Sequence, residues 1–111
     1  MKLKILYKLI QKCDVLVENF TPDRKVKYGL VYDKVKNLNS KIIHLSITGF
    51  GYGTNAIQNT PALDLTMQAL TGIMSVTGPK DEEEPVRIGV AWLDVLTGLT
   101  GTSGILSAMI Q

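Results

Sequence analysis

Two short apolar segments most strongly limit the fold of this chain. Residues 14–19 (DVLVEN) and residues 41–48 (KIIHLSIT) have the length and the apolar centre of β-strands. The sequence between them has helical signals in two parts, residues 21–28 and residues 31–39. A strand, a helical crossover and a second strand predict a βαβ unit, in which the two strands run parallel.

The first crossover helix has signals at both of its ends. Thr21 is a favoured N-cap residue, and Pro22 suits the first helical position because its missing N–H would have no partner there. Gly29 suits the end of this helix, where a left-handed residue is common.

The rest of the chain is predicted to form helices joined by loops. Leucines at helical spacing in residues 3–13 predict a surface helix that packs on the next strand. Residues 61–77 carry apolar side chains on two faces, which predicts a long buried helix. A final helix is expected from about residue 94, after polar loops at residues 49–60 and 78–87. The expected class is therefore α/β, with a βαβ unit followed by two long helices.

The predicted sheet has only two strands, so both of its edges lack a partner. The final helix is still apolar at Gln111 and has no stop signal. We therefore expect the chain to be a piece of a larger protein.

Composition and charge exclude several classes of function. The net charge is only +2, and no stretch interleaves basic with aromatic residues, so nucleic-acid binding is not expected. The single cysteine, Cys13, excludes an internal disulfide and fits a reducing compartment. Neither a metal-ligand spacing nor a Ser–His–Asp arrangement is found, so no metal site is expected. The lysine-bearing N-terminus lacks the Arg- and Ser-rich pattern of a presequence, so no targeting segment is expected.

Residues 88–110 are long and apolar enough to raise a transmembrane alternative. However, the segment holds four glycines and Asp94, and neither a basic cluster nor an aromatic belt frames it. We therefore expect no membrane partner.

Asp94 is the lone charged residue of the segment 89–104 (GVAWLDVLTGLTGTSG). A buried carboxylate is costly unless it is paired or hydrogen-bonded, so it needs an explanation. As an N-cap, Asp94 would accept a free backbone N–H of the final helix. As a nucleophile, it would use the same N–H groups to hold its orientation. The residues alone favour the cap and leave the nucleophile open.

Three glycines of the final helix, Gly98, Gly101 and Gly104, also need a reason. Each costs about 1 kcal/mol relative to alanine in a helix interior. Close approach of another backbone is the expected reason, and a bulky ligand is the alternative.

The ends of the two predicted strands form a candidate ligand site, because α/β folds bind ligands at the carboxyl ends of parallel strands. Asn19 and Phe20 end the first strand, and residues 49–51 (GFG) follow the second. Local turn bonds and core packing explain the same residues without a ligand. Three nearby basic residues are either phosphate ligands or part of a solvated face: Arg24, Lys25 and Lys27.

Four segments, in order, resemble the class III CoA-transferase family, which includes formyl-CoA transferase and carnitine-linked CoA-transferases. They are residues 13–20 (CDVLVENF), 29–51, 62–78 (ALDLTMQALTGIMSVTG) and 85–99 (PVRIGVAWLDVLTGL). The TGP…EPVRIGVA stretch is most similar to succinate/glutarate-type CoA-transferases. The resemblance implies that residues 1–111 are a partial central segment of a Rossmann-like large domain, with no second domain.

The resemblance implies an enzyme that moves CoA between carboxylic acids. Asp94 occupies the family position of the nucleophile, which forms an acyl anhydride and then an aspartyl-CoA thioester. No metal or redox cofactor is implied, since the CoA thioester is itself a substrate. The resemblance places CoA contacts at Asn19, Phe20, Thr21, Lys27, Pro61, Ala62, Leu63 and Asp64.

The resemblance also implies an interlocked homodimer for the full-length protein, and either the mitochondrial matrix or the cytoplasm as its location. Two alternatives remain: a truncated product without activity, and an acyl-CoA racemase of the same superfamily. A racemase needs a His–Asp pair, and the lone His44 lies within a strand. Two positions depart from the family pattern, Tyr52 in place of the common Gln and Leu63 in place of the usual Tyr.

Overall fold

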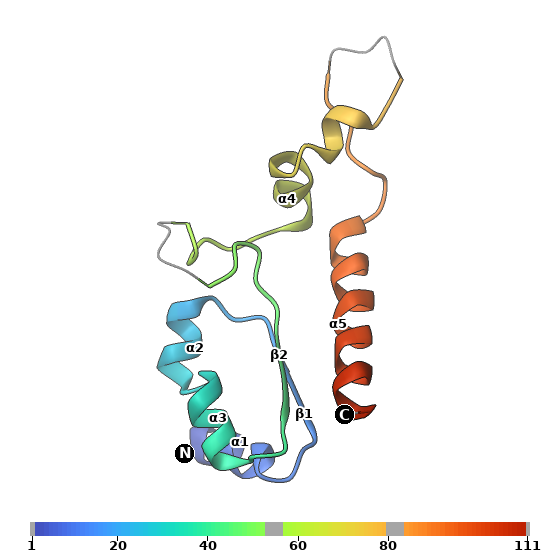
Figure 1. Cartoon of the computed structure of the whole chain (residues 1–111). Coiled ribbons are helices and arrows are strands. Elements are labelled where there is room, and N and C mark those ends of the chain that lie inside the picture. The colour runs from blue at the N-terminus through green and yellow to red at the C-terminus, as the bar shows by residue number, and fades with distance from the viewer. Residues whose placement is uncertain (1, 53–56, 80–83, 111) are drawn as a thin grey trace.

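A computed structural model describes residues 2–52, 57–79 and 84–110 of the chain (Figure 1). The predicted βαβ unit is confirmed. Its two strands are parallel, and two helices form the crossover. The elements of the whole chain are α1 (Lys2–Ile10), β1 (Val15–Glu18), α2 (Pro22–Tyr28), α3 (Tyr32–Leu38), β2 (Ile43–Ser46), α4 (Asp64–Leu70), the 3₁₀ helix η1 (Ile73–Val76) and α5 (Trp92–Ile110).

The register of the sheet decides which side chains share a face. Leu16 pairs with His44, and Glu18 pairs with Ser46. Since side chains alternate along a strand, these four side chains lie on one face and Leu45 lies on the other.

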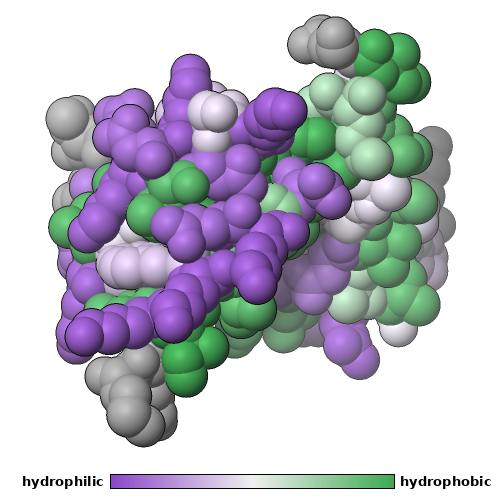
Figure 2. Space-filling view, turned by 90° about the horizontal axis from the view of Figure 1, so that it is seen from below, coloured by the Kyte–Doolittle hydropathy of each residue, from purple (hydrophilic) through white to green (hydrophobic). Residues whose placement is uncertain are grey.

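The helices cover the two faces of the sheet unequally. Helices α1 to α3 lie on one side and α5 lies on the other (Figure 1). Viewed from below, hydrophilic residues gather over the side of α1 to α3 and hydrophobic residues over the side of α5 (Figure 2). The buried core lies on the first side and consists of Ile10, Leu30, Val35 and Ile42.

Helix α2 begins and ends where its sequence signals predicted. Thr21 occupies the N-cap position with an extended backbone, but its side chain makes no capping hydrogen bond. Gly29 ends the helix in the left-handed conformation, with φ of 65°, and its N–H donates to Val26 O at 3.0 Å.

The prediction of one long buried helix over residues 61–77 was wrong. Helix α4 spans only Asp64–Leu70, and the chain turns at Gly72, whose φ is 76°, before the short η1. A left-handed residue cannot continue an α-helix, so the apolar pattern is divided between two short elements. The expected burial is also wrong, because Leu70 and Val76 are 64% and 82% exposed.

Helix α5 is confirmed as a long helix of 19 residues. Within the described part of the chain, it is the one helix whose length and apolar composition would allow it to cross a membrane, and little of it is buried. At Gly101 a Cβ would lie 2.7 Å from Leu45 Cδ2, so this glycine allows the close packing of a side chain and not the expected approach of a backbone. At Gly98 and Gly104 a Cβ would meet nothing within 4 Å, so the packing explanation fails at these two positions within the described structure.

Candidate active site

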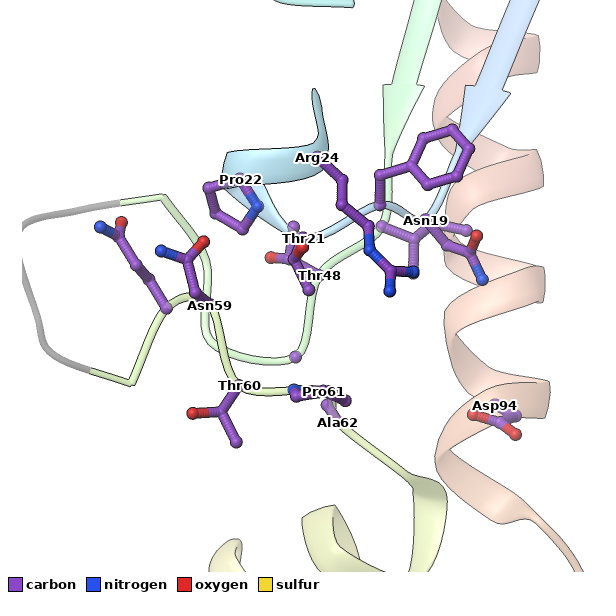
Figure 3. Close-up of a pocket in the computed structure, with 14 residues that line it drawn as sticks. Asn19, Thr21, Pro22, Arg24, Thr48, Asn59, Thr60, Pro61, Ala62 and Asp94 are labelled. Atoms are coloured by element: carbon purple, nitrogen blue, oxygen red, sulfur yellow. The ribbon is translucent and has the colours of Figure 1, made fainter. Parts of the chain in front are cut away.

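A pocket of about 490 Å³ lies at the carboxyl ends of the two strands (Figure 3). One side comes from the turn after β1, with Asn19, Phe20 and Thr21, and another from Thr48 and Gly49 after β2. The segment before α4 and the first turn of α5 complete it, so segments distant in the sequence meet here. The predicted site residues in this pocket are Asn19, Phe20, Thr21, Pro61, Ala62 and Asp94.

A second pocket of about 450 Å³ adjoins the first and shares Asn19, Thr48 and Asp94 with it. Leu63 and Asp64, also predicted site residues, line this second pocket. Asp94 is exposed and lines both pockets, so it lies where the two pockets meet.

Lys27 is the one predicted site residue that the structure places apart from the others. It is exposed on α2 and lines neither of these two pockets. Arg24, one helical turn earlier, lines the first pocket together with Asp94. The sequence showed both cations but not which of them faces the strand ends.

Asp94 is not the N-cap of α5, and that expectation was wrong. The helix begins at Trp92, so Asp94 lies within its first turn. Asp64 of α4 supplies the acceptor instead: its Oδ1 accepts the N–H of Leu93 at 2.8 Å and that of Asp94 at 3.4 Å. Asp94 keeps the favourable position of an acid near the positive end of a helix dipole.

Gln68 connects α4 to the segment that leads into α5. Its side chain is 1% exposed. Its Nε2 donates to Asp64 Oδ2 at 2.6 Å and to Val90 O at 3.3 Å, and its Oε1 accepts the N–H of Ile88 at 2.9 Å. Asp64 and Gln68 together therefore hold the start of α5, and with it the backbone of Asp94.

Gly49 allows the two chain segments that line the pocket to touch. A Cβ at Gly49 would lie 2.0 Å from Ala62 Cβ, which is closer than any real contact. The glycines after the second strand were predicted to serve either turn geometry or ligand approach, and Gly49 instead makes room for the side chain of Ala62.

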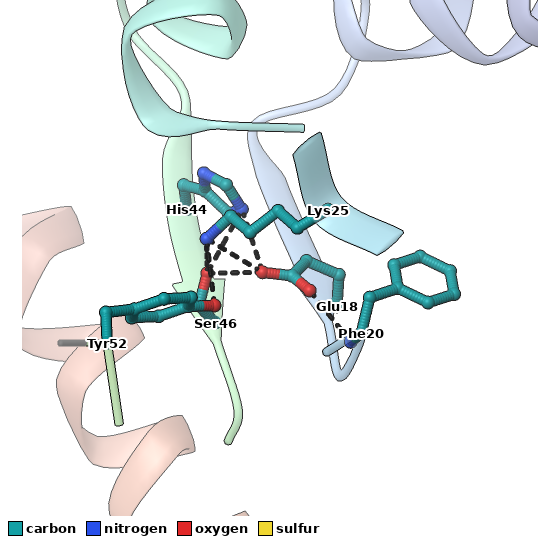
Figure 4. Close-up of polar contacts among 6 residues, drawn as sticks. All are labelled: Glu18, Phe20, Lys25, His44, Ser46 and Tyr52. Atoms are coloured by element: carbon teal, nitrogen blue, oxygen red, sulfur yellow. Dashed lines mark hydrogen bonds and ion pairs between the residues drawn. The ribbon is translucent and has the colours of Figure 1, made fainter. Parts of the chain in front are cut away.

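A buried polar cluster lies next to the pocket and was not predicted (Figure 4). Lys25 Nζ lies 3.1 Å from Glu18 Oε1, and both side chains are almost fully buried. Ser46 Oγ donates to Glu18, and Lys25 donates both to Ser46 and to Tyr52 OH, the latter at 3.0 Å. Tyr52 thus covers the buried lysine, whose Nζ lies 4.4 Å from the centre of the Tyr52 ring. One signal was available in the sequence. Glu18 follows Leu16 by two residues, and a strand places two such residues on the same face, so an acid next to the core could have been expected.

The cluster shifts two titrating groups. Burial raises the pKa of Glu18, but the hydrogen bonds from Ser46, Phe20 and Lys25, with the charge of Lys25, outweigh it and leave that pKa below its usual value. Burial, with the charge of Lys25, lowers the pKa of His44, and Glu18 opposes the shift only in part. The side chain of His44 is 1% exposed and its Nε2 lies 3.6 Å from Glu18 Oε1, so His44 belongs to this buried cluster.

The fold is that of an α/β protein with a pocket at the carboxyl ends of parallel strands, where such folds bind ligands, and with an exposed carboxylate at the border of that pocket. Residues 2–111 match the family model described as CoA-transferase family III, and the chain belongs to that family.

Similar proteins agree with this assignment. A succinate–glutarate CoA-transferase of Agrobacterium fabrum is 40% identical over 96% of this chain, and the human succinyl-CoA:glutarate CoA-transferase is 39% identical over 97%. A CAIB/BAIF family protein from Brucella suis matches 97% of this chain with a TM-score of 0.87 and 40% identity. The chain spans only 26% and 24% of the two curated relatives and 28% of the solved structure.

Proposed function

We propose that this chain carries the nucleophile and part of the CoA site of an enzyme that transfers CoA between carboxylic acids. The observation that carries the proposal is the placement of Asp94, an exposed carboxylate on the border of two pockets built from both strand ends. The names of the relatives support the same class of reaction.

In the proposed reaction, a carboxylate of Asp94 attacks the thioester carbonyl of the donor. This step forms a mixed anhydride and releases CoA thiolate. The thiolate attacks the Asp94 carbonyl, which frees the donor acid and leaves an aspartyl-CoA thioester. The acceptor carboxylate then attacks that thioester, and the returning thiolate takes the acceptor acyl group and frees Asp94. The reaction requires no metal or redox cofactor.

Different side chains of the pocket are proposed to contact different parts of CoA. Asn19, Phe20 and Thr21 supply amide, aromatic and hydroxyl groups for CoA beside one another. Arg24 is placed to pair with phosphate, since a guanidinium binds two phosphate oxygens at once. Lys27, exposed on the same helix, supplies longer-range attraction.

The segment before α4 is proposed to lie along CoA on the way to Asp94. Pro61 and Ala62 line the first pocket, and Leu63 and Asp64 line the second. These four residues therefore run from the first pocket, which Arg24 lines, to the second pocket, and Asp94 lines both.

We propose succinyl-CoA as donor and a dicarboxylate such as glutarate as acceptor, because the names of the first relatives describe that pair. The interlocked homodimer is part of the same proposal for the full-length protein. The mitochondrial matrix is the proposed compartment, as the resemblance to succinate/glutarate-type CoA-transferases implies, and the cytoplasm is the alternative.

The racemase alternative receives no support from the geometry. His44 is buried and bonded within the Glu18 cluster, and it lines none of the pockets described here. A His–Asp pair with Asp94 would require His44 to leave the face of the sheet that it shares with Glu18.

The test is to trap the intermediate. Purified protein is incubated with succinyl-CoA and treated with borohydride, which reduces an aspartyl thioester to an alcohol, and Asp94 is then located by peptide mass. The Asp94→Asn variant should show no modification and no CoA transfer. An exposed acid of α3 serves as the matched control, and Asp33→Asn should be modified at Asp94 as the parent is. Transfer retained in Asp94→Asn would refute the role, and no binding or transfer by the parent would favour a product without activity.

A further inference from the structure

Glu18 lies at the junction between the strand and the pocket wall. It is the last residue of β1, and the next three residues line the pocket before α2 begins at Pro22. Glu18 itself lines neither pocket, and its side chain lies in the polar cluster of Lys25, Ser46 and His44 (Figure 4).

One carboxylate oxygen of Glu18 binds within the turn formed by residues 19–21, and the other binds on the helix that follows the turn. Oε2 accepts the backbone N–H of Phe20 at 2.9 Å, inside the turn. Oε1 pairs with Lys25 Nζ at 3.1 Å, on the helix that follows the turn. One side chain therefore connects the end of β1, the turn and α2.

The burial of this ion pair needs an explanation other than stability. The side chains of Glu18 and Lys25 are 2% and 9% exposed. Desolvation cancels much of the attraction in such a pair, and apolar residues of similar volume often stabilise a fold equally well. What an apolar pair cannot supply is an acceptor for the N–H of Phe20.

We propose that Glu18 is a positioning residue for the CoA site: by accepting the N–H of Phe20 it fixes the turn at residues 19–21 in the shape that receives CoA. The proposal rests on the proposed function, because CoA is the ligand assigned to that pocket. Glu18 touches no ligand and acts through the backbone of Phe20.

Two double variants separate positioning from stability. Glu18→Leu/Lys25→Met removes both charges and the acceptor, whereas Glu18→Gln/Lys25→Met removes both charges but keeps an oxygen for the N–H of Phe20. CoA binding is measured by calorimetry, the Phe20 amide by hydrogen exchange, and folding by urea unfolding. We expect the Leu/Met pair to bind CoA about tenfold more weakly and to lose protection at Phe20, as loss of one hydrogen bond to a buried acceptor would cause. The Gln/Met variant should keep most of the CoA affinity and most of the hydrogen-exchange protection at Phe20.

The outcomes divide clearly. Equal CoA affinity in the two double variants would overturn the positioning role, even if their unfolding free energies differ, because a purely structural role predicts that pattern. Unchanged protection at Phe20 in the Leu/Met pair would also overturn it. If the parent protein binds no CoA, the proposed function fails and the assignment of Glu18 to a CoA site falls with it, while the exchange of Phe20 still decides whether Glu18 holds the turn.

Discussion

Asp64 is expected to contribute to stability as the acceptor for the start of α5. In Asp64→Ala, the N–H groups of Leu93 and Asp94 lose their acceptor, which lies 2.8 Å and 3.4 Å away, and the Nε2 group of the buried Gln68 keeps only Val90 O. A lost cap costs about 1 kcal/mol, and a hydrogen bond to a charged group contributes about 1.5–3 kcal/mol. Because Asp64 is half-buried, water replaces part of the lost hydrogen bonding. We therefore expect the free energy of unfolding to fall by about 2–3 kcal/mol.

The assay is urea unfolding at neutral pH, with helix content as the signal. The matched control is Asp33→Ala, which removes an exposed acid from the first turn of α3 and should cost only a few tenths of a kcal/mol. Asp64→Asn should lie between the two. Its oxygen can serve the α5 N–H groups, but its NH₂ must then face the Nε2 of Gln68, which cannot turn because its Oε1 accepts the N–H of Ile88. A free energy of unfolding for Asp64→Ala within the range of the control would refute this account.

Two further predictions concern close packing and pH. Gly49→Ala should lower the free energy of unfolding by about 1–3 kcal/mol, because its Cβ would overlap with Ala62. Gly104→Ala should raise the free energy of unfolding by about 1 kcal/mol, because a Cβ at Gly104 meets nothing within 4 Å. If Gly104→Ala lowers it instead, the packing reason for the difference between the two variants is wrong. Stability should also fall on acidification. Because the folded state lowers the pKa of His44, His44 contributes to the free energy of unfolding above pH 6.5, and this contribution is lost as the pH falls below that value. The lowered pKa of Glu18 contributes in the same way, and its contribution is lost as the pH falls below 4.5. Unfolding curves measured between pH 4 and pH 8 for the parent and His44→Gln test this, and an unchanged slope near pH 6 in the variant would contradict the assignment to His44.

The sequence predicted the elements whose signals are local. The two strands, the crossover helices and the left-handed Gly29 follow from apolar runs and capping residues, and each is found where expected. The long helix over residues 61–77 failed because periodicity records the apolar faces and not the conformation of Gly72, which divides them. One glycine within a helical pattern is tolerated often enough that it does not predict a break.

Local signals could not predict which residues would cooperate across the chain. The capping of α5 by Asp64 joins residues about thirty positions apart, and the position of Asp94 alone suggested that it capped the helix itself. The pairing of Glu18 with Lys25 depends on α2 folding back over the sheet, so neither charge marked the other in the sequence. The same fold-back decides that Arg24 faces the pocket and that Lys27 does not.

The structure holds the backbone of Asp94 more firmly than its side chain. Asp64 and Gln68 bind the start of α5 through hydrogen bonds, whereas the carboxylate of Asp94 is exposed between two pockets. The proposed reaction needs this combination, because the same carboxylate must first attack a thioester and then be attacked by the thiolate. A fixed backbone keeps the carboxylate at the border of both pockets, and a free side chain can rotate between the two geometries. A direct bond to the Asp94 carboxylate would favour one step and slow the other, so support through the backbone suits a nucleophile that acts in both steps.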